Sequence, residues 1–263
     1  MKKHWLAFAL VLIANVLGNP VTASSDLCGV TIFENLELDH DLVCSGDGLL
    51  IGADGITVRL NGHTIAGSNA GAGIVVAGRT NIRIAGGTIR NFQTGIRLNN
   101  SSRVLIYENN ISSNTMDGVD LQAGSVENTV KENEIRDNFS RGIMLRGDAN
   151  RNTVKENVFI GNNVGILLFQ PIGSIVKENV VAESRTAGIR VRFTATGNVI
   201  KENQVVSNPA GIEFLVSPTG SPASGNSVIE NALATNACGL KGPVTGNTVT
   251  ENRFQGNDAD TCQ

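Results

Sequence analysis

Short segments that follow a recurring glycine alternate apolar with polar residues. In each segment an Ile, Val or Leu comes directly after the glycine, and a second apolar residue often lies two positions further on, as in Ile96 and Leu98. An alternation with period 2 is typical of a strand that buries one face. The segments are also rich in Ile, Val, Thr and Asn, which favours strands and turns over helices. The glycines are Gly73, Gly95, Gly118, Gly142, Gly165, Gly188, Gly211 and Gly239.

These glycines return at a nearly constant interval of 22, 23, 24, 23, 23, 23 and 28 residues. A second phrase, Val130-Lys131-Glu132-Asn133, recurs in step with them. A fixed period near 23 indicates a repeat fold in which each unit contacts its neighbours. Three short strands per repeat, stacked in parallel, predict an all-β parallel β-helix of about nine turns. A leucine-rich repeat has a similar period but needs a Leu-rich consensus and a helical half, which this chain lacks.

One asparagine per repeat falls in a single register of the pattern. Its amide side chain can bond to the asparagine of the next turn, and asparagine suits a tight turn with positive φ. We therefore predict a structural asparagine ladder with inward apolar residues on both sides, such as Val130 and Ile135. The ladder residues are Asn109, Asn133, Asn157, Asn179, Asn203, Asn231 and Asn252.

The repeats, opened by Leu60-Asn61-Gly62-His63-Thr64-Ile65, resemble those of right-handed parallel β-helix proteins of the pectin-lyase-like superfamily. They look like the repeats of NosD-type periplasmic proteins and of carbohydrate-binding and sugar-hydrolase β-helix domains. The resemblance covers residues 49–255. It implies the fold but hardly the activity, because lyases, hydrolases, epimerases, adhesins and non-catalytic proteins share this architecture.

The N-terminus has the features of a secretory signal peptide over residues 1–23. Lys2 and Lys3 precede an apolar run that is too short to span a bilayer, and Val21-Thr22-Ala23 fits a cleavage site. Loss of the two lysines changes the formal net charge from −3 to −5. A mildly acidic exported chain without basic runs is a poor candidate for binding nucleic acid, and we predict no membrane insertion of the mature chain. We therefore expect a secreted or periplasmic protein.

An even number of cysteines in an exported chain indicates disulfides. Cys238 and Cys262 lie about one repeat apart, so they fall on adjacent turns, and Cys28 and Cys44 lie together before the repeats. We predict the pairs 28–44 and 238–262, one at each end. Residues 24–48 are expected to form an N-terminal cap and residues 256–263 a C-terminal cap, because the ends of a solenoid need covering.

The outward positions of the glycine-led strand are the place to look for a binding site. We predict an exposed apolar patch of Met144, Leu167 and Phe169, bordered by arginines. An aromatic ring beside guanidinium groups suits an acidic sugar polymer. Simple cross-strand charge pairing is the alternative explanation of the charged residues. The candidate ligand-binding residues are Met144, Arg146, Leu167, Phe169, Arg190, Arg192 and Glu213.

Catalysis has weaker support in the sequence. Glycoside hydrolysis generally needs two carboxyl groups within about 10 Å, whereas Asp120 and Glu213 lie four turns apart. Asp117 is nearer to Asp120, but we place it in the turn before the strand. A lyase could use arginine as base and charge neutraliser. The candidate catalytic residues are therefore Arg146, Arg190, Arg192 and Asp120.

A column of glutamates, one per repeat beside the ladder asparagine, raises the question of Ca²⁺. Neighbouring lysines, such as Lys131 beside Glu132, favour a solvated charged face instead. Copper, implied by the NosD resemblance, lacks a soft-ligand cluster, since His40, His63, Met116 and Met144 occupy different registers. We predict no required cofactor and no metal site.

The sequence as a whole favours an exported, non-catalytic protein that binds extracellular or envelope carbohydrate. Two alternatives remain open. One is a lyase, hydrolase or epimerase acting on an acidic polysaccharide. The other is a structural or adhesive rod that binds a protein partner through the Met144–Phe169 patch. The sequence does not define the oligomeric state.

Overall fold

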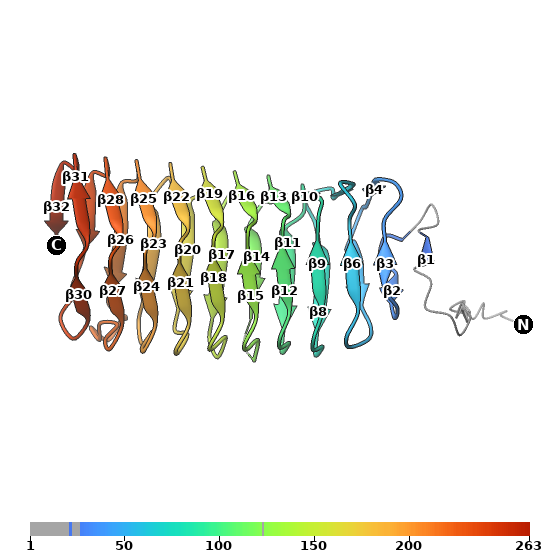
Figure 1. Cartoon of the computed structure of the whole chain (residues 1–263), viewed down its shortest axis with the longest axis horizontal. Coiled ribbons are helices and arrows are strands. Elements are labelled where there is room, and N and C mark those ends of the chain that lie inside the picture. The colour runs from blue at the N-terminus through green and yellow to red at the C-terminus, as the bar shows by residue number, and fades with distance from the viewer. Residues whose placement is uncertain (1–20, 23–26, 123) are drawn as a thin grey trace, which may run out of the picture.

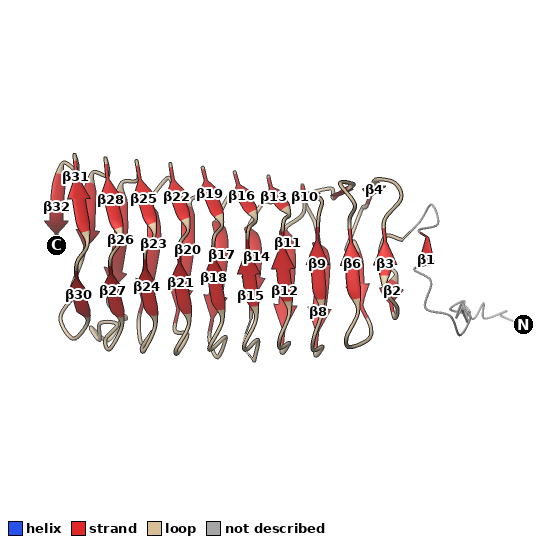
Figure 2. Ribbon diagram, viewed as in Figure 1, coloured by secondary structure: helices blue, strands red, loops and turns tan. Residues whose placement is uncertain are grey.

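The computed structural model describes residues 21–22, 27–122 and 124–263, and these form a regular stack of short parallel strands (Figure 1). All the regular secondary structure in the described part of the chain is strand (Figure 2). None of those residues builds a helix of the length and apolarity that crossing a bilayer demands. The predicted signal peptide lies largely outside the described residues and stays a prediction.

Each turn contributes one strand to each of three parallel sheets, here called A, B and C. Sheet A contains β1 (Val21–Thr22), β3 (Leu36–Glu37), β6 (Thr57–Arg59), β9 (Arg83–Ala85), β12 (Leu105–Tyr107), β15 (Thr129–Lys131), β18 (Thr153–Lys155), β21 (Ile175–Lys177), β24 (Val199–Lys201), β27 (Ser227–Ile229) and β30 (Thr248–Thr250). Sheet B contains β2 (Thr31–Ile32), β5 (Leu49–Ile51), β8 (Ala72–Ala77), β11 (Thr94–Asn99), β14 (Asp117–Leu121), β17 (Arg141–Arg146), β20 (Val164–Phe169), β23 (Ala187–Arg192), β26 (Ala210–Leu215), β29 (Cys238–Lys241) and β32 (Ala259–Cys262). Sheet C contains β4 (Leu42–Val43), β7 (Thr64–Ala66), β10 (Thr88–Arg90), β13 (Asn110–Ser112), β16 (Glu134–Arg136), β19 (Val158–Ile160), β22 (Val180–Ala182), β25 (Gln204–Val206), β28 (Ala232–Ala234) and β31 (Arg253–Gln255).

The predicted parallel β-helix is confirmed, with about ten turns rather than about nine. The additional turn comes from the segment expected to be a cap. Strands β2, β3 and β4 pair with β5, β6 and β7, and so continue all three sheets toward the N-terminus. At the other end β32 pairs with β29. The segments at both ends of the stack therefore add strands to the same sheets as the middle turns do.

The core is a continuous column of apolar side chains inside the three sheets. Sheet B supplies inward residues such as Ile143 and Ile166, while Val130 and Ile135 come from sheets A and C, and all four are fully buried. The repeated glycine is the second residue of each sheet B strand from β8 to β29, and it lets adjacent turns approach closely at the start of the strand. A Cβ atom on Gly142 would lie 2.5 Å from the carbonyl oxygen of Gly165, so larger residues are excluded there.

The predicted asparagine ladder is confirmed. Its side chains are buried in the middle of the stack, and each amide bonds to the next turn, as from Asn133 Nδ2 to Asn157 Oδ1 at 3.0 Å. The backbone prediction was wrong: the positive φ belongs to the residue before the asparagine, for example Glu156 at 55°. The chain bends at the glutamate, from the sheet A strand into the sheet C strand, and the asparagine side chain points inward to its partners.

Two further ladders lie at the other corners of the coil and were not predicted. They sit five residues before and five residues after the first ladder. Serine replaces asparagine once in each, at Ser174 and Ser184. The second ladder is Asn114, Asn138, Asn162, Ser184, Asn208, Asn236 and Asn257. The third is Asn128, Asn152, Ser174, Asn198, Asn226 and Asn247.

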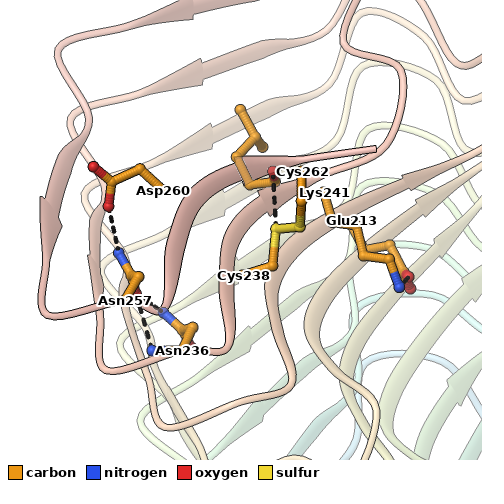
Figure 3. The surroundings of a disulfide bond; sticks show 8 residues. Glu213, Asn236, Cys238, Lys241, Asn257, Asp260 and Cys262 are labelled. Carbon is orange, nitrogen blue, oxygen red and sulfur yellow. Dashed lines mark hydrogen bonds and ion pairs between the residues drawn. A yellow bond between two sulfur atoms is a disulfide. The ribbon is translucent and has the colours of Figure 1, made fainter.

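Both predicted disulfides are present, Cys28–Cys44 near the N-terminal end and Cys238–Cys262 at the C-terminal end. The second joins β29 to the last strand, with the two Cα atoms 6.3 Å apart (Figure 3). Close by, Asn257 Oδ1 accepts a hydrogen bond from Asn236 Nδ2 at 3.1 Å, and Asn257 Nδ2 donates to Asp260 Oδ1 at 3.2 Å. The disulfide and these side-chain bonds fix the final strand to the body of the stack.

Candidate functional site

The outward side chains of sheet B form the candidate site, and the register of the strands aligns them in columns. Asp120 pairs with Met144 across one step of the sheet, and Leu167 pairs with Arg190 across another. In the second outward column Phe169 lies between Arg146 and Arg192. Parallel strands lie about 4.8 Å apart, so these side chains touch their neighbours on the strands above and below.

The predicted exposed apolar patch is wrong for two of its three residues. Met144 is 8% exposed and Leu167 is 3% exposed, because they pack on the outside of the sheet with Val164 and the ring of Phe169. Large side chains in register on adjacent strands shield one another from solvent. Phe169 remains partly exposed and is the accessible member of the cluster.

Asp117 and Asp120 occupy the same small pocket, of about 110 Å³, next to this cluster. Asp117 is the first residue of β14, not a residue of the preceding turn as we expected. Both its carboxylate oxygens accept bonds from Arg141, at 2.6 Å from Nε and 2.8 Å from Nη2. Asp117 is buried, and this two-point pairing compensates for the loss of water around its charge.

Asp120 is held differently. Its Oδ2 accepts bonds from Gln122 at 3.0 Å and from Arg146 at 2.9 Å, whereas Oδ1 is buried without a hydrogen-bond partner among the described residues. Burial raises the pKa of Asp120, and the negative charge of Asp117 adds to the increase. Gln122 and Arg146 oppose this shift without cancelling it. The pocket therefore holds a carboxyl group that binds a proton more tightly than an exposed aspartate does.

A second charged cluster lies further along the same face. Arg190 Nε donates to Glu213 Oε2 at 2.6 Å, and Lys241 Nζ lies 3.2 Å from the other oxygen of that carboxylate. Figure 3 shows Glu213 beside Lys241, near the terminal disulfide. Glu213 is buried, and the positive charges of Arg190 and Lys241 beside it compensate for the removal of its carboxylate from water. Asp120 and Glu213 are separated by four strand steps and act in different clusters, as predicted.

An aromatic cluster that the sequence analysis missed completes the face. The rings of Phe169 and Phe193 meet edge to face, with centroids 5.0 Å apart. The guanidinium of Arg192 lies over both rings, 5.5 Å from the centroid of Phe169 and 4.6 Å from that of Phe193. The sequence signal was the aromatic residue directly after the strand, at a corner where most other turns have Gly, Asn or Gln.

The outer face of sheet A carries the predicted lysine and glutamate columns. Each lysine pairs with the glutamate that follows it, for example Lys155 with Glu156 at 3.2 Å and Lys177 with Glu178 at 3.1 Å. The hydrogen bond from Lys177 lowers the pKa of Glu178. In the described part of the chain, no three His, Cys, Asp or Glu residues are arranged to hold a metal ion.

Comparison with known proteins places this geometry in context. A family model described as "Right handed beta helix region" matches residues 22–171, 72–231 and 142–259. No curated protein matches the chain in sequence.

Several solved structures have the same fold at low sequence identity. An alginate lyase from Paenibacillus sp. str. FPU-7 is 16% identical, with a TM-score of 0.58 over 89% of this chain and 90% of that one. The periplasmic alginate epimerase AlgG is 17% identical, with a TM-score of 0.64 over 84% and 72%. A tailspike protein of E. coli bacteriophage HK620, in complex with a pentasaccharide, is 11% identical, with a TM-score of 0.68 over 85% of this chain and 50% of that one. At these identities the likeness shows the fold alone.

Proposed function

The chain belongs to the right-handed β-helix family, and from this fold and its sheet B face we propose that it binds an acidic polysaccharide outside the cytoplasm. The observation that carries the proposal is the concentration of arginines on the outer face of one sheet. They lie on strands β11, β17 and β23, in two clusters with aromatic and carboxylate side chains between them. The arginines are Arg97, Arg141, Arg146, Arg190 and Arg192.

The chemistry of the face suits such a polymer. Guanidinium groups bind carboxylates through two parallel hydrogen bonds, and the partly exposed ring of Phe169 offers an apolar surface for a sugar. The face runs along the rod, so an extended chain can contact several turns at once. The titles of the neighbours add support by fold analogy, since they name alginate enzymes and a bound pentasaccharide.

Binding is tested with immobilised polyuronates, such as alginate and polygalacturonate, against neutral glucans. We expect retention on at least one polyuronate, weakening as salt is added because charge contributes to affinity. Phe169→Ala should weaken the binding, with Phe139→Ala as a matched control, since Phe139 is an exposed ring outside sheet B. Equal retention on neutral and acidic polymers, or no retention at all, would contradict the proposal.

A second candidate function is proton transfer on such a polymer, favoured by the unpartnered oxygen and raised pKa of Asp120. The carboxylate would take the proton from the sugar carbon beside the uronate group. In a lyase the bond between the neighbouring carbon and the glycosidic oxygen then breaks, and that oxygen takes up a proton. In an epimerase a second proton, supplied by water, would be added to the same carbon from the opposite face, and Asp120 would release the first proton to solvent. Arg146 and Arg190 are bound to carboxylates, so they serve better as charge neutralisers than as bases.

This candidate is tested by incubating the protein with each polyuronate and measuring soluble oligosaccharides, unsaturated ends and the uronate composition. Asp120→Asn should abolish any such turnover while the polymer is still bound. Binding without any chemical change in the polymer would contradict the catalytic candidate and support non-catalytic binding. A partner protein is less well supported, because Met144 and Leu167 are buried and leave little of the patch for docking.

The proposal also includes export of the chain from the cytoplasm. Two disulfides fit an oxidising compartment, and one neighbour is described as periplasmic. We propose cleavage near Ala23, giving a secreted or periplasmic protein. Mass spectrometry of the mature N-terminus after expression with the full leader tests this directly. A mature chain that still carries Lys2 would contradict it.

A further inference from the structure

Arg192 differs from the other arginines on the outer face of sheet B. Arg97 lies 3.6 Å from Asp47, and the others are ion-paired within 3 Å: Arg141 with Asp117, Arg146 with Asp120 and Arg190 with Glu213. Across the described residues, Arg192 forms no such ion pair. Its close neighbours are instead the rings of Phe169 and Phe193. The guanidinium is thus positioned by aromatic faces, and its charge is not neutralised by the protein.

Phe193 holds this position in an unfavourable backbone conformation. The residue directly after a sheet B strand repeatedly has positive φ, at 63° for Gly78, 49° for Asn100, 60° for Gly147 and 67° for Gln170. Gly and Asn adopt this left-handed region readily, whereas a bulky side chain does not. Phe193 adopts it with φ of 59°. Positive φ recurs at the corners of this coil, so the conformation belongs to the shared corner geometry, and at Phe193 it brings the ring against Arg192.

Arg192 Nε is buried without a hydrogen-bond partner among the described residues, so the two terminal Nη nitrogens are the part of the guanidinium that can meet a ligand. Cation–π contacts fix its plane, and a guanidinium so fixed loses little freedom when it binds a planar anion through two hydrogen bonds. Polar side chains lie at the same corner, where Gln170 Nε2 donates to Thr194 Oγ1 at 3.3 Å. The side chains of Gln170 and Thr194 can also form hydrogen bonds with sugar hydroxyls. Arg192, Phe169 and Phe193 therefore combine an anion receptor with an apolar surface for the sugar that carries the anion.

We infer that Arg192, clamped by Phe169 and Phe193, is a subsite that recognises the carboxylate of one uronic acid residue. The inference rests on the proposed polysaccharide binding, and it names the carboxylate as the chemical group of the polysaccharide that Arg192 recognises. The adjacent strands β20 and β17 connect the subsite to the pocket of Asp120, so one bound chain can reach both. Arg192 would anchor the chain there by a charge that no protein carboxylate already neutralises.

The test compares three ligands: a uronate oligosaccharide, the same oligosaccharide with its carboxyl groups reduced to alcohols, and a sulfated neutral oligosaccharide. For the unmodified uronate we expect Arg192→Gln to lower affinity at least tenfold by calorimetry. Arg192→Lys should restore little of it, because an ammonium lacks the planar fork. The reduced ligand should bind the wild type and Arg192→Gln equally. Lys201→Gln, which removes a charge from sheet A, is the control and should leave affinity unchanged.

The possible outcomes distinguish a failure of the Arg192 subsite from a failure of the proposed polysaccharide binding. If the wild type binds no uronate ligand, the proposed function fails. If it binds but Arg192→Gln binds as tightly, the inference alone fails. Full restoration by Arg192→Lys, or an equal loss with the sulfated ligand, would show a general charge effect in place of a carboxylate subsite. Phe193→Gly should lower uronate affinity several-fold without lowering the melting temperature. A lower melting temperature with unchanged affinity would make the ring purely structural.

Discussion

The outer faces of sheets A and B stand on the same scaffold and differ in how their side chains repeat. On sheet A the phrase Val-Lys-Glu-Asn returns turn after turn, and its lysines and glutamates pair on the surface. On sheet B the column that contains Asp120 changes at every turn, from arginine to aspartate, methionine, leucine, arginine and glutamate. A side chain that recurs at the same position in successive turns is explained by the needs of the repeated fold. The varied column needs a separate explanation, and ligand binding provides one.

The two faces should respond very differently to the loss of one charged partner. Arg141→Ala leaves the buried carboxylate of Asp117 without its two-point partner. We expect a loss of about 3 to 5 kcal/mol in the free energy of unfolding, measured by chemical denaturation. A loss under about 1 kcal/mol would mean that Asp117 is solvated or protonated, and the contrast between the faces would weaken.

The asparagine ladders support both faces, so their loss should be costly wherever it occurs. The Asn157 amide donates to the carbonyls of Val130 and Lys155 and accepts from Asn133. Asn157→Ala leaves these buried groups unpaired, and we expect a loss of about 2 to 3 kcal/mol. Asn252→Ala, near the end of the stack where the side chain is partly exposed, is the matched control and should lose less.

Asp120 gives the sheet B face a dependence on pH of opposite sign to that expected from Glu178 on sheet A, whose pKa is lowered. Its pKa is raised in the folded protein above the ordinary value of 3.8, so the folded state binds more protons than the unfolded state between the two values. Stability should therefore fall as pH rises through that window. Denaturation at a series of pH values should show this decline in the wild type and a smaller one in Asp120→Asn. Identical profiles would contradict the assignment.

The smallest effect is expected on sheet A. Lys155 and Glu156 form an exposed pair, which water and salt screen. Lys155→Ala should change the free energy of unfolding by less than about 1 kcal/mol, and the change should disappear at high salt. A loss as large as that of Arg141→Ala would remove the distinction between a repeated surface and a functional one.

The sequence predicted what depends on a regular period and missed what depends on neighbours in space. The ladder through Asn133 was visible because an identical phrase surrounds each copy. The other two ladders lie five residues away on either side, but Ser174 and Ser184 interrupt them and their flanking residues vary. A search for the five-residue spacing would have found both.

Burial on the sheet B face was misjudged for a physical reason. Alternation correctly placed Met144 and Leu167 on the outside, but outward does not mean exposed when adjacent strands also carry large side chains. Similarly, nothing in the local pattern indicates that Phe193 adopts a left-handed conformation, since that depends on the corner geometry shared by successive turns. The candidate columns were thus predictable, whereas their accessibility and the aromatic clamp were not.

The most direct test of the central claim compares two doubly substituted proteins of equal charge. One carries Arg97→Gln and Arg192→Gln on sheet B, and the other carries Lys155→Gln and Lys201→Gln on sheet A. Affinity for the same polyuronate is measured by calorimetry at fixed salt, with folding checked by circular dichroism. Binding should be lost in the sheet B variant and retained in the sheet A variant. Equal losses in the two variants, or full binding by both, would contradict the claim that sheet B is the recognition face.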